Sequence, residues 1–155
     1  EFKIPATLVH LLPDDRLPLQ YTQVPSIEPL PLTGATVLVV EDSLVVALEI
    51  EKQLRQCGAA KVLLSGTLGE ALVHASSAPI DIALLDINLK GTQSYAVADE
   101  LAARGIPFAF ATGYGNEVRL PGRFGGYAVI AKPWTAAAIA AAVAALLPKR
   151  GAKAT

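Results

Sequence analysis

Five short apolar runs, separated by stretches with helical spacing, constrain the fold of this 155-residue chain more than any other feature. The first run, 36–40, is continuous and rich in β-branched residues, which is typical of a strand buried on both faces. The other runs lie at 61–64, 80–85, 107–111 and 127–131. Strands that alternate with helices through short connections form one parallel sheet covered by helices on both faces. The sequence therefore predicts an α/β fold with a five-stranded parallel sheet.

Helix signals fall between and after these runs, at 43–57, 67–77, 93–104 and 135–147. Three of these segments begin at a hydroxyl residue that is suited to cap a helix, namely Ser43, Thr67 and Thr135. The segment 113–126, between the fourth and fifth strands, is rich in glycine. We therefore expect the fourth helix of the fold to be shortened or mobile.

The proline distribution separates the N-terminal part of the chain from the rest. Six of the eleven prolines lie between Pro5 and Pro31. Proline fixes φ and removes a backbone donor, so this stretch cannot be a long helix or a central strand. We expect a proline-rich linker or arm at 1–35, one domain at 36–148 and a tail at 149–155. The chain contains no methionine, which indicates a piece of a longer protein or a processed product.

Composition excludes several classes of function. Hydrophobic residues make up 52% of the chain, which excludes global disorder. Thirteen basic and fourteen acidic residues leave no basic field for nucleic acid or anionic lipid. The alanine-rich stretch 135–147 is shorter than the roughly 20 residues that span a bilayer, so no membrane insertion is expected. The single cysteine, Cys57, indicates a reducing, cytoplasmic compartment, and we expect it to be a small core residue.

Polar residues that could bind a ligand or take part in a reaction follow four of the five strands: Glu41, Asp42, Asp86, Thr112 and Lys132. Ligands of open parallel sheets bind beyond the carboxyl ends of the strands. Three carboxylates crowded there repel one another unless a cation shares them, and oxygen ligands suit Mg²⁺. Such a site can hold a phosphoryl group against one carboxylate, which can itself be the nucleophile and form an acyl phosphate. Taken singly, an acidic residue after a strand is usually a turn residue or a helix cap, and a lone Thr-Gly or Lys-Pro is usually a turn.

Four segments carry a family resemblance: VLVVED at 37–42, ALLDINL at 83–89, FATGY at 110–114 and AKPW at 131–134. Their order and spacing resemble the response-regulator receiver domain of two-component signalling over about residues 36–148. The resemblance implies a flavodoxin-like (βα)5 receiver fold. Trp134 stands at a position that is usually a core aromatic in this family.

The resemblance also implies roles for the acidic residues. Asp86 resembles the aspartate that accepts phosphate from a phosphohistidine. Glu41 and Asp42 resemble the acidic pair that holds Mg²⁺ together with Asp86. Asn88 matches the position whose backbone carbonyl completes the metal shell. The proline that usually follows the phosphoacceptor is missing here.

Two further residues resemble the switch elements of the family. Thr112 resembles the hydroxyl that turns toward the phosphoryl group, and Lys132 the lysine that pairs with a phosphoryl oxygen. The usual switch aromatic is replaced by Val129. We therefore expect the signal to appear as ordering of 113–126, with Tyr114 either supplying the moving aromatic or packing on the surface.

The FATGY segment is similar to an atypical receiver subfamily associated with HWE-type histidine kinases or with stress-response regulators. The resemblance implies a phosphoacceptor that takes phosphate from a histidine kinase or phosphotransfer protein and catalyses only its own phosphorylation and dephosphorylation. We expect the C-terminal receiver of a hybrid histidine kinase. The alternative is a stand-alone regulator with an N-terminal arm, and a homodimer through helical faces remains open.

Two other classes compete with the receiver. A phosphatase of the haloacid-dehalogenase kind also uses an aspartyl phosphate and Mg²⁺, but it needs an aspartate where this chain has Asn88. A binding module that never takes phosphate is disfavoured by the complete set of aspartate, threonine and lysine. Flavin binding is disfavoured because Glu41 and Asp42 form a poor cradle for phosphate.

Overall fold

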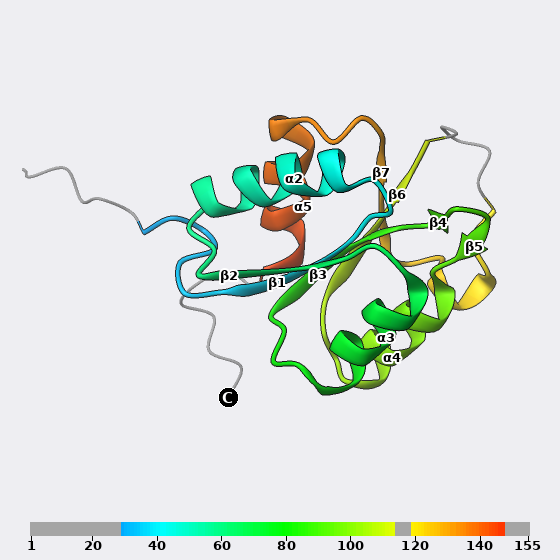
Figure 1. The fold of residues 1–155 in the computed structure, drawn as a ribbon. Coiled ribbons are helices and arrows are strands. Elements are labelled where there is room, and N and C mark those ends of the chain that lie inside the picture. Colours follow the sequence, from blue (N-terminus) through cyan, green and yellow to red (C-terminus); the bar gives the residue numbers. More distant parts are fainter. Residues whose placement is uncertain (1–28, 114–118, 148–155) are drawn as a thin grey trace, which may run out of the picture.

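The computed structural model describes residues 29–113 and 119–147 (Figure 1). The first part of the expected arm, Tyr114 and the expected tail lie outside the described residues. Five parallel strands form one sheet in the order β2-β1-β3-β6-β7. They are β1 (Thr36–Val40), β2 (Lys61–Ser65), β3 (Ile82–Asp86), β6 (Phe108–Thr112) and β7 (Ala128–Ala131). The predicted five-stranded parallel sheet is therefore confirmed.

Two layers of helices cover the sheet (Figure 1). One face carries α2 (Leu44–Gln56) and α5 (Ala136–Leu146), and the other carries α3 (Leu68–Ser77) and α4 (Tyr95–Ala103). Each layer encloses a core, because alternate residues of the buried strands β1, β3 and β6 point to opposite faces. Cys57 is partly buried against the core under α2 and α5. This arrangement is the flavodoxin-like fold that was predicted.

The predicted capping residues act at three of the helices. The side chains of Ser43, Thr67 and Thr135 accept hydrogen bonds from the backbone N–H groups three residues ahead, at 3.4, 3.2 and 3.0 Å. These bonds satisfy donors that the first helical turn leaves without partners. Among the described residues, no helix is long and apolar enough to pass through a bilayer.

A small hairpin between β3 and α4 was not predicted. Its strands, β4 (Asn88–Leu89) and β5 (Thr92–Gln93), pair antiparallel around Lys90 and Gly91. Both turn residues have positive φ, 49° and 86°, which a tight two-residue hairpin turn requires. The hairpin delays the start of α4, which was expected near Gln93, to Tyr95.

A single 3-10 turn, η3 (Gly122–Phe124), occupies the described part of the segment where a short fourth helix was expected. The ring of Phe124 is almost fully buried and contacts four other rings, those of Tyr95, Phe108, Phe110 and Tyr127. This one aromatic side chain thus covers part of the sheet that a full helix would otherwise cover. Residues 114–118 of the glycine-rich segment lie outside the described residues.

The last residues of the expected arm pack against the domain. Leu32 is fully buried in the core, and its N–H donates to the carbonyl of Cys57 at 2.9 Å. The chain passes so close to Gly58 that a Cβ there would lie 3.0 Å from the backbone nitrogen of Thr33. Gly58 also has φ of 100°, which ends α2 as glycine commonly does.

We predict that Leu32→Ala destabilises the domain, although the residue precedes the first strand. Removing a fully buried leucine side chain leaves a cavity and should lower the free energy of unfolding by about 2–5 kcal/mol. The matched control is Leu30→Ala, because Leu30 is 51% exposed and its loss should change that free energy by less than about 0.5 kcal/mol. Urea unfolding of both variants measures the difference. Equal stabilities for the two variants would contradict the packing described here.

Candidate functional site

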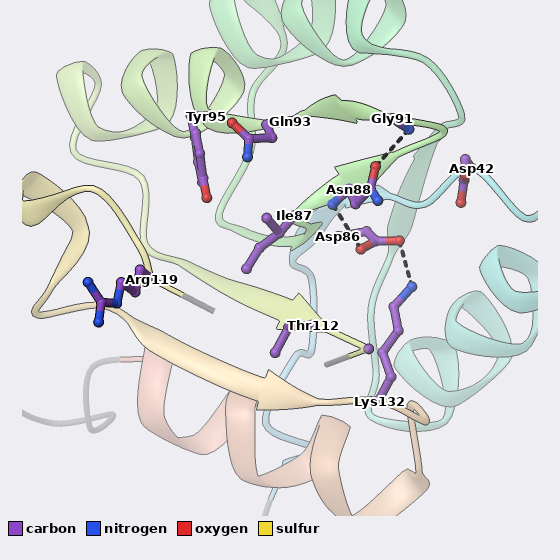
Figure 2. A pocket seen from close by; sticks show the side chains of 11 residues that line it. Asp42, Asp86, Ile87, Asn88, Gly91, Gln93, Tyr95, Thr112, Arg119 and Lys132 are labelled. Atoms are coloured by element: carbon purple, nitrogen blue, oxygen red, sulfur yellow. Dashed lines mark hydrogen bonds and ion pairs between the residues drawn. The ribbon is translucent and has the colours of Figure 1, made fainter. Parts of the chain in front are cut away.

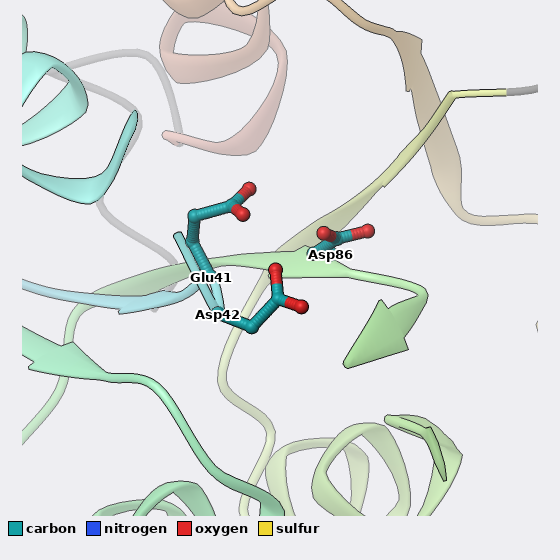
Figure 3. Close-up of side chains that lie close together, drawn as sticks. All are labelled: Glu41, Asp42 and Asp86. Atoms are coloured by element: carbon teal, nitrogen blue, oxygen red, sulfur yellow. The ribbon is translucent and has the colours of Figure 1, made fainter. Parts of the chain in front are cut away.

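Three carboxylates meet at the carboxyl ends of the adjacent strands β1 and β3 (Figure 3). Glu41 and Asp42 directly follow β1, and Asp86 is the last residue of β3, which pairs with β1. One oxygen from each of the three lies within 4.8 Å of the others. Glu41 and Asp86 are 3% and 4% exposed, whereas Asp42 is half-buried. The parallel topology thus brings together the acidic residues that the sequence analysis singled out.

Lys132 is the cation of this cluster. It follows β7, and its Nζ lies 2.5 Å from Oδ2 of Asp86 (Figure 2). The same Nζ lies 3.1 Å from Oε2 of Glu41. Partial burial alone would lower the pKa of Lys132, but the hydrogen bonds to Asp86 and Glu41 outweigh it and raise the pKa. The ammonium form is therefore favoured at this position.

Glu41 is the most enclosed member of the cluster. Burial raises its pKa, although hydrogen bonds from the Ser43 backbone and from Lys132 oppose the rise. A further donor is Trp134, whose indole N–H lies 3.2 Å from Oε2 of Glu41. Trp134 is 8% exposed, as expected of a core aromatic. Its bond to the acidic cluster was not predicted, because a core position gives no indication of where an indole nitrogen points.

Asp86 and Asp42 are held by backbone donors from the unpredicted hairpin. The N–H of Asn88 lies 3.2 Å from Oδ1 of Asp86, and the N–H of Lys90 lies 3.1 Å from Oδ2 of Asp42. A further contact comes from Ser94, whose hydroxyl donates to the backbone carbonyl of Asp86 at 2.6 Å. The two oxygens of Asp86 therefore have different partners, the hairpin on one side and Lys132 on the other.

The cluster opens into a cavity of about 650 Å³. Its lining includes all the predicted site residues except Glu41, which lies buried beside it: Asp42, Asp86, Asn88, Thr112 and Lys132. Thr112 is the last residue of β6 and is 4% exposed. Among the remaining lining residues, three carry polar side chains that the sequence analysis missed, Gln93, Tyr95 and Arg119 (Figure 2). Gln93 and Tyr95 could have been found from the sequence, because they follow Asp86 closely in the chain and lie near the start of the next helix.

The donor set fits a divalent cation. Three carboxylates and one ammonium leave a formal charge of −2 at the cluster (−3 + 1), and its carboxylates offer the oxygen ligands that Mg²⁺ prefers. Such a cation would relieve the repulsion among the three neighbouring acids. Glu41, Asp42 and Asp86 are therefore the residues that could hold it.

The known proteins that this chain resembles are found among solved structures. Neither a family model nor a curated protein sequence matches the chain. Among solved structures, SdrG from Sphingomonas melonis Fr1 is 40% identical, with 76% of this chain and 98% of that chain covered at a TM-score of 0.64. The BeF3-activated conformation of SdrG from Pseudomonas melonis Fr1 is 37% identical, with 79% and 100% covered at 0.62.

A more distant structure shows the same fold. The CheY-like response regulator receiver domain from Methylobacillus flagellatus is 20% identical to this chain. The comparison covers 74% of this chain and 100% of that chain at a TM-score of 0.65. At this identity the likeness concerns the fold alone.

We predict a pH-dependent effect of Glu41→Gln in the absence of divalent cations. Because burial raises the pKa of Glu41 above its ordinary value of 4.5, the folded protein holds this proton more tightly than the unfolded chain. The resulting stability is present below about pH 4.5 and is lost as the pH rises through the raised pKa. Glutamine does not titrate, so the variant should gain stability relative to the wild type over that interval.

Urea unfolding in a chelating buffer between about pH 4 and pH 8 measures this effect. Glu49→Gln, on the exposed side of α2, is the matched control and should follow the wild-type curve. Parallel curves for the wild type and Glu41→Gln would show that Glu41 has no raised pKa in the folded protein.

Proposed function

Because the chain belongs to the receiver domains of two-component response regulators, we propose that it accepts a phosphoryl group on Asp86 from a phosphohistidine. The donor is a histidine kinase or a phosphotransfer protein. The observation that carries the proposal is the contact of Asp86 with Lys132 at 2.5 Å, inside a cluster of three carboxylates that opens into a cavity. Asp86 is the only member of the cluster that both lines this cavity and pairs with the lysine.

In the proposed transfer, a carboxylate oxygen of Asp86 forms a bond to phosphorus as the bond between phosphorus and the donor imidazole breaks. The N–H of Asn88 holds one oxygen of Asp86 while Lys132 contacts the other. Lys132 then turns from Asp86 to an oxygen of the phosphoryl group, and its favoured ammonium form offsets the charge that develops there. The domain would catalyse only this step and the later hydrolysis of its own aspartyl phosphate.

Mg²⁺ is the proposed cofactor. Its ligands would come from Glu41, Asp42 and Asp86, with the backbone carbonyl of Asn88 completing the shell. When bound, Mg²⁺ supplies positive charge to the phosphoryl oxygens. Among the acids, half-buried Asp42 lines the cavity, whereas Glu41 is enclosed by donors of the protein itself.

The proposed switch begins at Thr112, which turns toward the bound phosphoryl group. Val129 stands where the switch aromatic of the family is expected, and it is 46% exposed on the edge strand β7. We therefore assign the response to ordering of 113–126. Tyr114 is the candidate for the moving aromatic, with surface packing as the alternative, and it lies outside the described residues.

We also propose the kind of protein in which this domain works. We favour the C-terminal receiver of a hybrid histidine kinase in the cytoplasm, within the subfamily associated with HWE-type kinases. The alternative is a stand-alone regulator with an N-terminal arm. A homodimer through the helical faces is compatible with either arrangement.

We predict that Asp86→Asn abolishes labelling by acetyl phosphate in the presence of Mg²⁺, because the amide is not a nucleophile, while the fold survives. Phosphate-affinity electrophoresis measures the labelling, and circular dichroism checks the fold. Glu49→Gln is the matched control and should label like the wild type. Retained labelling of Asp86→Asn would overturn the assignment, and sustained turnover of a phosphomonoester by the wild type would favour a phosphatase.

Asp42→Asn should weaken the binding of Mg²⁺ rather than remove the nucleophile. The loss of one carboxylate from the cation site should raise the Mg²⁺ concentration for half-maximal labelling by about tenfold or more. Asp99→Asn is the control, because Asp99 pairs with Arg123 on the outer side of α4 and does not line the cavity. An unchanged Mg²⁺ titration for Asp42→Asn would remove Asp42 from the proposed ligand set.

A further inference from the structure

Ser94 occupies the N-cap position of α4, but its side chain does not cap the helix. Its side chain makes no capping hydrogen bond, unlike those of Ser43, Thr67 and Thr135 at the other three helices of the described residues. Instead the hydroxyl donates to the backbone carbonyl of Asp86 at 2.6 Å. The side chain is fully buried, so this bond satisfies a polar group that has no access to water.

The backbone of Ser94 makes a second bond to the same place. Its N–H donates to the carbonyl of Ile87 at 2.9 Å. The two bonds join the end of the hairpin segment to its beginning, directly beside the phosphoacceptor. The segment is therefore closed at its base by one residue that contacts two consecutive carbonyls of the chain.

The closed segment carries backbone N–H groups that donate hydrogen bonds to the acidic cluster. The N–H of Asn88 reaches Oδ1 of Asp86, and the N–H of Lys90 reaches Oδ2 of Asp42. Both donors lie between the two points that Ser94 joins. If the base of the segment opened, these two hydrogen bonds would lose their fixed geometry. The carbonyl of Asp86 would also lose its fixed position.

We propose that Ser94 is a positioning residue for phosphoryl transfer, which fixes the backbone of Asp86 and, through the hairpin, the direction of its carboxylate. The inference rests on the proposed function of Asp86. Ser94 does not touch the reacting atoms. Its contribution is to keep one carboxylate oxygen aligned while Lys132 holds the other. Misplacement of a reacting group by about 1 Å can slow a reaction by about a hundredfold.

The test compares two variants that are isosteric with each other, so that the effect of the hydroxyl is separated from the effect of packing. Ser94→Thr keeps the donor, and Ser94→Val has the same shape without it, so both carry the same excess volume in a buried position. At saturating Mg²⁺ and acetyl phosphate, we expect Ser94→Val to label about tenfold more slowly than Ser94→Thr. Thr67→Ala removes a true helix cap and should lower the melting temperature without changing the labelling rate.

Amide hydrogen exchange gives a second readout that does not depend on phosphorylation. The N–H of Asn88 should exchange faster in Ser94→Val than in Ser94→Thr, and it should be unchanged in Thr67→Ala. Equal labelling rates and equal exchange in the two Ser94 variants would overturn the inference. If the wild type accepts no phosphate at all, the proposed function fails, whereas the exchange of Asn88 still decides whether Ser94 positions the segment.

Discussion

The contact between one ammonium and two buried carboxylates organises the functional end of this domain. Lys132 lies between Asp86 and Glu41, and the hydrogen bonds to them outweigh the cost of its partial burial. Without the cation, Glu41 and Asp86 would be two buried negative charges facing each other, which proteins avoid unless the charges are paired. The cluster retains an excess of negative charge, which fits the divalent ion proposed above.

The topology explains why a lysine supplies this charge. β6 lies between β3, which ends in Asp86, and β7, which precedes Lys132. Two strand spacings amount to about 10 Å, and only a long side chain reaches back over such a distance. The backbone N–H of Lys132 extends the pairing by donating to the carbonyl of Thr112 at 2.9 Å, so the lysine starts from a fixed point. The edge strand thus contributes to a site on the central strands without carrying a buried face of its own.

Sequence reasoning predicted the parts of the site that depend on strand order and missed the parts that depend on local turns. Glu41, Asp86 and Lys132 could be predicted to meet because parallel strands deliver their carboxyl ends to one edge of the sheet. The hairpin around Lys90 could not, since its turn places a lysine at positive φ, a conformation that lysine seldom adopts. The role of Ser94 could not be predicted either. A serine before a helix predicts a cap, whereas the hydroxyl of this serine bonds to the strand. The indole contact of Trp134 depends on a side-chain rotation that no pattern records.

The aromatic cluster limits where the proposed switch can act. Tyr95 lines the cavity and packs against both Phe110 and Phe124, so the cavity wall is continuous with the η3 turn. Phe124 is 1% exposed, and burying such a ring contributes roughly 1.5–3 kcal/mol. The pair between Arg123 and Asp99 is exposed and contributes little by comparison. A rearrangement of 113–126 that leaves the core intact is therefore confined to the part before Phe124, and a larger one must first withdraw that ring from its neighbours.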